Sequence, residues 1–102
     1  MKKLLKQKYP MPKAVFVDVD GTLELRGMQL NTPLVSKLRE MKGSGFELYL
    51  WSARGRAHAE RVASKHGLTA LFNAILPKPG VAVDDVGWRW CAFVKQMKVG
   101  RM

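Results

Sequence analysis

Two aspartates, Asp18 and Asp20, stand two positions apart between an apolar run and the dipeptide Gly21-Thr22. On an extended backbone, residues two apart place their side chains on the same side. Neighbouring carboxylates repel each other unless a cation lies between them or one of them holds a proton. The pair therefore predicts a hard divalent metal ion or a tuned acid/base group, and an acidic turn that only caps a strand is the alternative. Thr22 adds a hydroxyl and a backbone N–H that can donate to an anion.

Four segments have the apolar, β-branched or aromatic composition that is typical of strands. They are residues 14–17, 46–51 and 81–83, with a weaker candidate at 72–75. Two helices are predicted between them. Thr32 is the expected N-cap and Pro33 the first helical residue of a helix that ends near residue 43. Apolar residues at helical spacing indicate a second helix before Gly67, which suits a left-handed C-terminal residue.

Strands that alternate with helices of this length imply right-handed crossovers and a small, mainly parallel sheet in a three-layer α/β sandwich. Ligands of such sheets bind beyond the carboxyl ends of the strands. Polar residues gather there: Asp18 and Asp20 follow the first strand, Ser52 the second, and Asp84 and Asp85 the last. The sequence therefore predicts one site at which these residues converge.

The composition bounds the class of protein. The chain of 102 residues suffices for a single domain, residues 14–102, preceded by a basic arm, residues 1–13. Its formal net charge of +10 predicts attraction to nucleic acid, phosphorylated substrates or acidic membranes, whereas a role in solubility alone is the simpler explanation. The apolar runs are far shorter than the roughly 20 residues that cross a bilayer, so we expect no membrane span. The single cysteine, Cys91, excludes an intrachain disulfide and a Cys-rich zinc site and favours the cytoplasm.

The segment Asp18-Val19-Asp20-Gly21-Thr22-Leu23 resembles motif I of the haloacid dehalogenase-like (HAD) superfamily, whose phosphatases carry Asp-x-Asp-Gly-Thr after the first strand. Three further positions are similar to the later motifs in the same order: Ser52, Lys78 and the pair Asp84 and Asp85. The resemblance covers about residues 14–86. It implies a Rossmann-like core without a cap domain, because residues 24–31 leave room only for a turn or flap, and residues 53–77 only for one helix and one strand.

The resemblance implies catalysis through an aspartyl-phosphate. Asp18 would be the nucleophile, and Asp20 would be the acid/base that protonates the leaving oxygen and later deprotonates water. Ser52, together with backbone N–H groups near Ala53 and Thr22, would hold phosphoryl oxygens.

Two cations near the site have open assignments. Lys78 is the best-placed lysine to offset charge between Asp18 and a phosphate, but many relatives have a helix between this lysine and the acidic pair, so an ordinary surface lysine is the alternative. Arg54 is expected either to orient a substrate phosphate or to be a solvated charge at the start of a helix. His58 and His66 receive no role.

Magnesium is the cofactor that the resemblance implies, and its hard cation needs oxygen ligands. The ligands would be Asp18, the backbone carbonyl of Asp20, and the acidic pair. We expect Asp85 to bind the metal directly and Asp84 to support it or also to contact it.

These inferences together predict a magnesium-dependent phosphomonoester hydrolase with a phosphorylated substrate. An uncapped site suits a bulky substrate, and the positive charge favours a phosphorylated end of DNA or RNA, with Trp88 and Trp90 available to stack on a base. Two alternatives remain: a small-metabolite phosphatase closed by oligomerisation, and a non-catalytic, basic nucleic-acid-binding module on the same scaffold.

Overall fold

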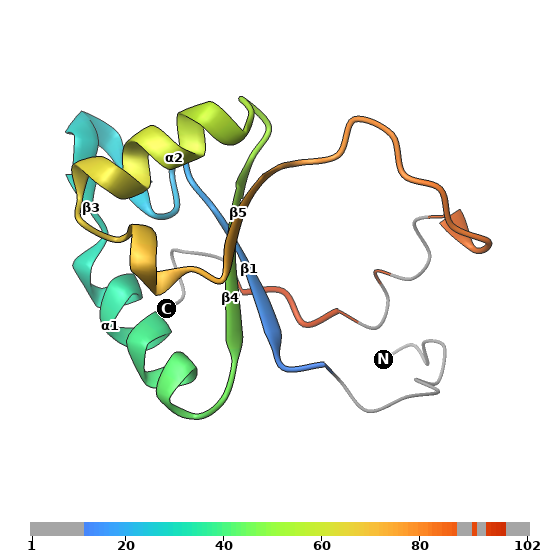
Figure 1. Ribbon diagram of the computed structural model, residues 1–102, viewed down its shortest axis with the longest axis horizontal. Coiled ribbons are helices and arrows are strands. Elements are labelled where there is room, and N and C mark those ends of the chain that lie inside the picture. The colour runs from blue at the N-terminus through green and yellow to red at the C-terminus, as the bar shows by residue number, and fades with distance from the viewer. Residues whose placement is uncertain (1–11, 88–90, 92–93, 98–102) are drawn as a thin grey trace.

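The computed structural model describes residues 12–87, 91 and 94–97 (Figure 1). Most of the predicted basic arm, and Trp88 and Trp90, lie outside these residues. The elements in chain order are β1 (Ala14–Asp18), β2 (Glu24–Leu25), η1 (Arg26–Met28), β3 (Gln29–Leu30), α1 (Thr32–Gly43), β4 (Glu47–Ser52), α2 (Arg56–Lys65), η2 (Thr69–Leu71) and β5 (Ala74–Pro77). No helix within the described part of the chain is long and apolar enough to cross a membrane.

The main sheet has three strands, all parallel, in the order β1-β4-β5. Asp18 pairs with Trp51, and Ser52 pairs with Pro77, so the last residues of the three strands lie at one edge of the sheet. The predicted α/β class and mainly parallel sheet are confirmed. β2 and β3 form a separate antiparallel hairpin, which is the short flap expected in place of a cap.

Both helices pack on the same face of the sheet (Figure 1). Along β1 and β4 the buried side chains alternate with exposed or half-buried ones, because successive residues of a strand point to opposite faces. Among the residues that the structure describes, fourteen buried apolar side chains form the core: Val17, Val19, Leu23, Leu34, Val35, Leu38, Leu48, Leu50, Ala59, Val62, Ala63, Leu68, Leu71 and Phe72. The described residues therefore form two layers, and the third layer that we expected is not among them.

The segment that follows β5 differs from the prediction. Residues 81–83 are not a strand, and Val81 and Val83 are 85% and 98% exposed. The chain instead leaves the sheet after β5 as an open loop (Figure 1). Pro77 and Pro79 interrupt the strand because proline has no backbone N–H to donate and also restricts the residue before it. The separate last strand that composition predicted at residues 81–83 is not formed, because these residues pair with no strand of the described sheet.

Asn31, rather than Thr32, caps α1. Its buried side chain accepts a hydrogen bond from the Leu34 N–H at 3.2 Å and donates one to the Thr22 carbonyl at 3.0 Å. The predicted cap was thus one residue too late, since both residue types are good N-caps and only the fold selects between them. Gly67 follows α2 with a φ of +69°, as predicted. The Asn31 side chain joins the start of α1 to the turn after β1.

Replacing Asn31 with alanine should lower the free energy of unfolding by about 2 kcal/mol, because the cap is lost and the Thr22 carbonyl loses its partner. Thr32→Ala is the matched control and should cost less than about 0.5 kcal/mol, since Thr32 is exposed. Urea denaturation of both variants measures the difference. Equal losses, or a larger loss at Thr32, would contradict the assignment of the cap.

Candidate functional site

A tight turn holds the residues that follow β1. The N–H groups of Thr22 and Glu24 both donate to the Val19 carbonyl, at 3.2 and 3.0 Å, and Gly21 has a φ of +80°. Val19 and Leu23 are completely buried and anchor the turn in the core. The Thr22 N–H is therefore used within the turn in this structure, and its donation to a bound anion stays a prediction.

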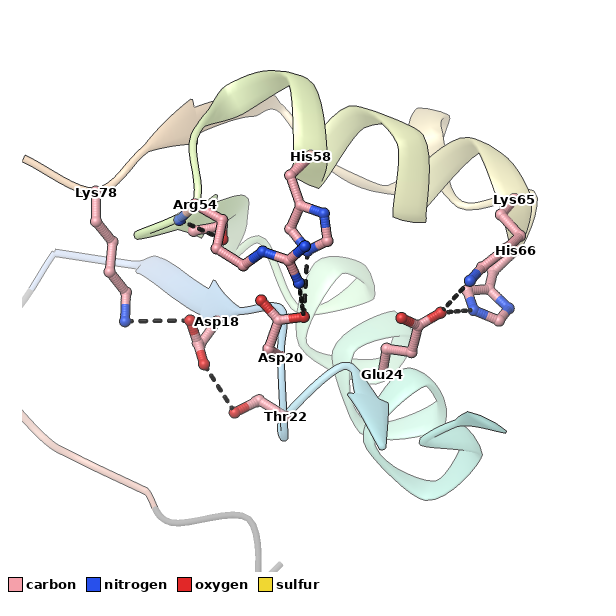
Figure 2. Close-up of polar contacts among 10 residues, drawn as sticks. Asp18, Asp20, Thr22, Glu24, Arg54, His58, Lys65, His66 and Lys78 are labelled. Atoms are coloured by element: carbon pink, nitrogen blue, oxygen red, sulfur yellow. Dashed lines mark hydrogen bonds and ion pairs between the residues drawn. The ribbon is translucent and has the colours of Figure 1, made fainter. Parts of the chain in front are cut away.

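Asp18 lies between a lysine and a hydroxyl (Figure 2). Its Oδ1 is 3.1 Å from the Lys78 Nζ, and its Oδ2 accepts a hydrogen bond from the Thr22 hydroxyl at 3.4 Å. Lys78 is the first residue after β5, and its backbone N–H donates a hydrogen bond to the Ser52 carbonyl at 2.9 Å. Of the two assignments left open for this lysine, the structure favours the one beside Asp18, because the parallel register carries it to the same edge of the sheet.

Ser52 is the last residue of β4, one position beyond Trp51, the register partner of Asp18, and it is buried. Its Oγ accepts a hydrogen bond from the Arg54 N–H at 3.0 Å. A serine hydroxyl both donates and accepts, so this contact leaves the hydroxyl proton free to be directed at a ligand. Ala53 is exposed in the turn between β4 and α2. The N–H groups of this turn are thus partly used to hold the serine in place.

Asp20 contacts two basic side chains, neither of which is the partner of Asp18 (Figure 2). The Arg54 Nη1 and the His58 Nε2 lie 3.3 and 3.1 Å from the same oxygen, Oδ1. Arg54 is mostly exposed, whereas the His58 side chain is only 12% exposed. The two carboxylates therefore tolerate each other because each has a different basic partner.

His58 is the site residue that the sequence did not identify. It occupies the third position of α2, which begins four residues after the end of β4. A helix that starts so soon after a strand must place its first turn over the carboxyl edge of the sheet. That position, rather than any metal-ligand spacing, is the signal that would have found it.

The two aspartates at the end of the predicted last strand do not join the site. Among the described residues, no three His, Cys, Asp or Glu side chains gather where a metal ion could be held. The Asp84 Oδ1 instead accepts a hydrogen bond from the Val86 N–H at 2.9 Å within its own loop. The predicted four-aspartate cluster is thus not formed, because the segment that carries Asp84 and Asp85 leaves the sheet.

Glu24 fastens the β2–β3 hairpin to the end of α2 (Figure 2). Its Oε2 lies 2.6 Å from the Lys65 Nζ and 2.9 Å from the His66 Nε2, and the glutamate side chain is mostly buried. The hydrogen bond from Lys65, followed by that from His66, lowers the pKa of Glu24 below its usual value. The hairpin therefore stays against the domain beside the turn that carries Asp20.

At neutral pH, Glu24→Gln should reduce the free energy of unfolding by roughly 0.5–1 kcal/mol. Because the folded protein holds the lower pKa, this contribution is present above the ordinary glutamate pKa and is lost as the pH falls through the lowered pKa. Denaturation curves at a series of pH values measure the difference between wild type and variant. Glu60→Gln is the control, because it makes the same carboxylate-to-amide change at an exposed position of α2 that lacks the contacts of Glu24. A difference that stays constant into strong acid would refute the ion pair as its origin.

Comparison of the chain with protein-family models, with curated proteins and with solved structures finds no match. The assignment of function therefore depends on the residues and geometry described above.

Proposed function

We propose that the protein is a phosphomonoester hydrolase that forms an aspartyl-phosphate on Asp18, on a HAD-like core without a cap. The observation that carries the proposal is the contact of Lys78 with Asp18 at the edge where β1, β4 and β5 end. Ser52, the last residue of β4, lies at the same edge. A nucleophilic carboxylate, a hydroxyl and an ammonium group at one strand edge are what phosphoryl transfer requires: an attacking oxygen and donors for the phosphoryl oxygens. The lone cysteine favours the cytoplasm as its compartment.

In the first step, an Asp18 carboxylate oxygen attacks phosphorus in line with the leaving oxygen. The new bond joins Asp18 to phosphorus while the bond from phosphorus to the alcohol oxygen breaks. Asp20 enters this step with a proton on Oδ2, the oxygen that neither Arg54 nor His58 contacts, and gives this proton to the departing alkoxide. The Ser52 hydroxyl and the Lys78 ammonium stabilise the charge on the phosphoryl oxygens.

In the second step, water attacks the phosphorus of the aspartyl-phosphate. Asp20, now ionised, takes the proton from this water, and the bond between phosphorus and the Asp18 oxygen breaks. Inorganic phosphate leaves, and both aspartates return to their starting states. Arg54 and His58 contact the Asp20 carboxylate and hold it in position for both proton transfers.

Magnesium is part of the proposal, with Asp18 and the Asp20 carbonyl as its protein ligands. Mg²⁺ keeps several waters and often takes only one or two carboxylates together with substrate phosphate, so this small oxygen donor set fits it without Asp84 or Asp85. When bound, the ion neutralises phosphoryl charge. Loss of turnover on chelation, restored by added Mg²⁺, is the expected behaviour.

Asp18→Asn should reduce the rate of phosphate release from a small phosphomonoester by at least about a thousandfold, since an amide is not a nucleophile. Asp20→Asn should reduce it by roughly a hundredfold or more, the usual contribution of a general acid/base. Phosphate release in the presence of Mg²⁺ is the measurement.

Glu60→Gln is the control for these variants, because it makes a comparable carboxylate-to-amide change at an exposed helix position. It should retain full activity, and circular dichroism should show all three variants folded. Activity that survives Asp18→Asn would rule out the nucleophile, and hence the proposed mechanism.

A further inference from the structure

Three aromatic rings lie side by side on the face of the sheet opposite the helices. Phe16 of β1 stacks on Tyr49 of β4, with ring centroids 4.9 Å apart, and meets Trp51 at 4.8 Å in a tilted arrangement. Their strand positions alternate with the buried core residues, which places them on the other face. Phe16, at the centre, is 46% exposed. We call Phe16, Tyr49 and Trp51 the aromatic strip.

One end of the aromatic strip, Trp51, adjoins the candidate site. Trp51 is the register partner of Asp18 and immediately precedes Ser52. The Lys78 ammonium lies 5.8 Å from the centre of the Trp51 ring while it pairs with Asp18. At the other end of the strip, the Tyr49 hydroxyl donates a hydrogen bond to the Glu47 carboxylate. The negative charge of Glu47 therefore lies at the end of the strip that is far from Asp18. A ligand with a phosphate at Asp18 would therefore have an apolar, aromatic surface beside it.

We propose that the aromatic strip binds the bases of a single-stranded nucleic acid whose terminal phosphate reaches Asp18. This inference rests on the proposed function and names its substrate class. Bases stack on aromatic side chains largely without regard to sequence, and such surfaces occur in many single-strand-binding proteins.

Charge and dimensions both favour this ligand. The net charge of +10 attracts a polyanion, whereas a small sugar phosphate would leave the rings unused. Tyr49 and Trp51 are two strand positions apart, about 7 Å, which matches the rise of roughly two stacked bases. A protein segment covering the same rings is the competing occupant.

The test measures binding and turnover separately. Binding of a fluorescent oligothymidylate with a terminal phosphate is measured in the Asp18→Asn background, where it is not hydrolysed. In that background, Phe16→Leu should weaken binding about tenfold, the effect of one lost stack, and Tyr49→Leu should weaken it similarly. In the wild-type background, Phe16→Leu should lower kcat/KM for the phosphorylated oligonucleotide several times more than kcat/KM for glycerol phosphate, which has no base to stack.

Met28→Leu is the matched control, because Met28 is an exposed apolar residue of the hairpin and lies outside the strip. It should alter neither binding nor turnover. Added salt should weaken binding by wild type and by Phe16→Leu in parallel, since the rings contribute no charge, and the ratio of their Kd values should persist.

Unchanged oligonucleotide binding in both Phe16→Leu and Tyr49→Leu would overturn the inference. So would a change of oligomeric state on size-exclusion chromatography that accounts for the whole loss, because the rings would then be a protein interface. Hydrolysis of glycerol phosphate without strip-dependent oligonucleotide binding would refute the strip and leave the proposed function standing. Strip-dependent binding by a protein that hydrolyses neither substrate would refute the proposed function and support the strip.

Discussion

Parallel pairing of three strands is the constraint on which the candidate site depends. Because β1, β4 and β5 run in the same direction and in fixed register, residues that are far apart in the sequence must lie at one edge. Asp18, Ser52 and Lys78 are the residues at or just after those three ends. The hydrogen bond from the Lys78 N–H to the Ser52 carbonyl extends this alignment one residue beyond β5 and brings the ammonium group to Asp18.

Basic side chains at the same edge also offset the repulsion between the carboxylates of Asp18 and Asp20. Instead of sharing one cation, Asp18 faces Lys78 while Asp20 faces Arg54, from the turn after β4, and His58, from the first turn of α2. Separate partners allow the two aspartates to differ in role. Asp18 supplies the oxygen that attacks phosphorus, and Asp20 transfers the proton. The buried Asn31 cap of α1 also holds the turn after β1, which carries Asp20, so stability and site geometry depend on the same residue.

Local pattern was sufficient to predict the parts of the fold in which sequence and packing agree. The apolar runs before Asp18 and Ser52, and the apolar spacing of both helices, match β1, β4, α1 and α2. Local pattern was insufficient where the structure of a segment, or the role of a residue, depends on contacts with residues far away in the sequence. The valines at 81–83 have strand composition but no described strand beside them, and His58 matters only because its helix begins at the sheet edge.

The stereochemical course at phosphorus tests the central claim most directly, because it does not depend on whether an intermediate accumulates. A phosphorothioate monoester, made chiral at phosphorus by its sulfur and two oxygen isotopes, would be hydrolysed in water that carries the third oxygen isotope, and the configuration of the released thiophosphate determined. Each in-line displacement inverts the configuration. Transfer to Asp18 followed by hydrolysis predicts net retention, whereas net inversion would show that water attacks the substrate directly and that Asp18 is not a nucleophile.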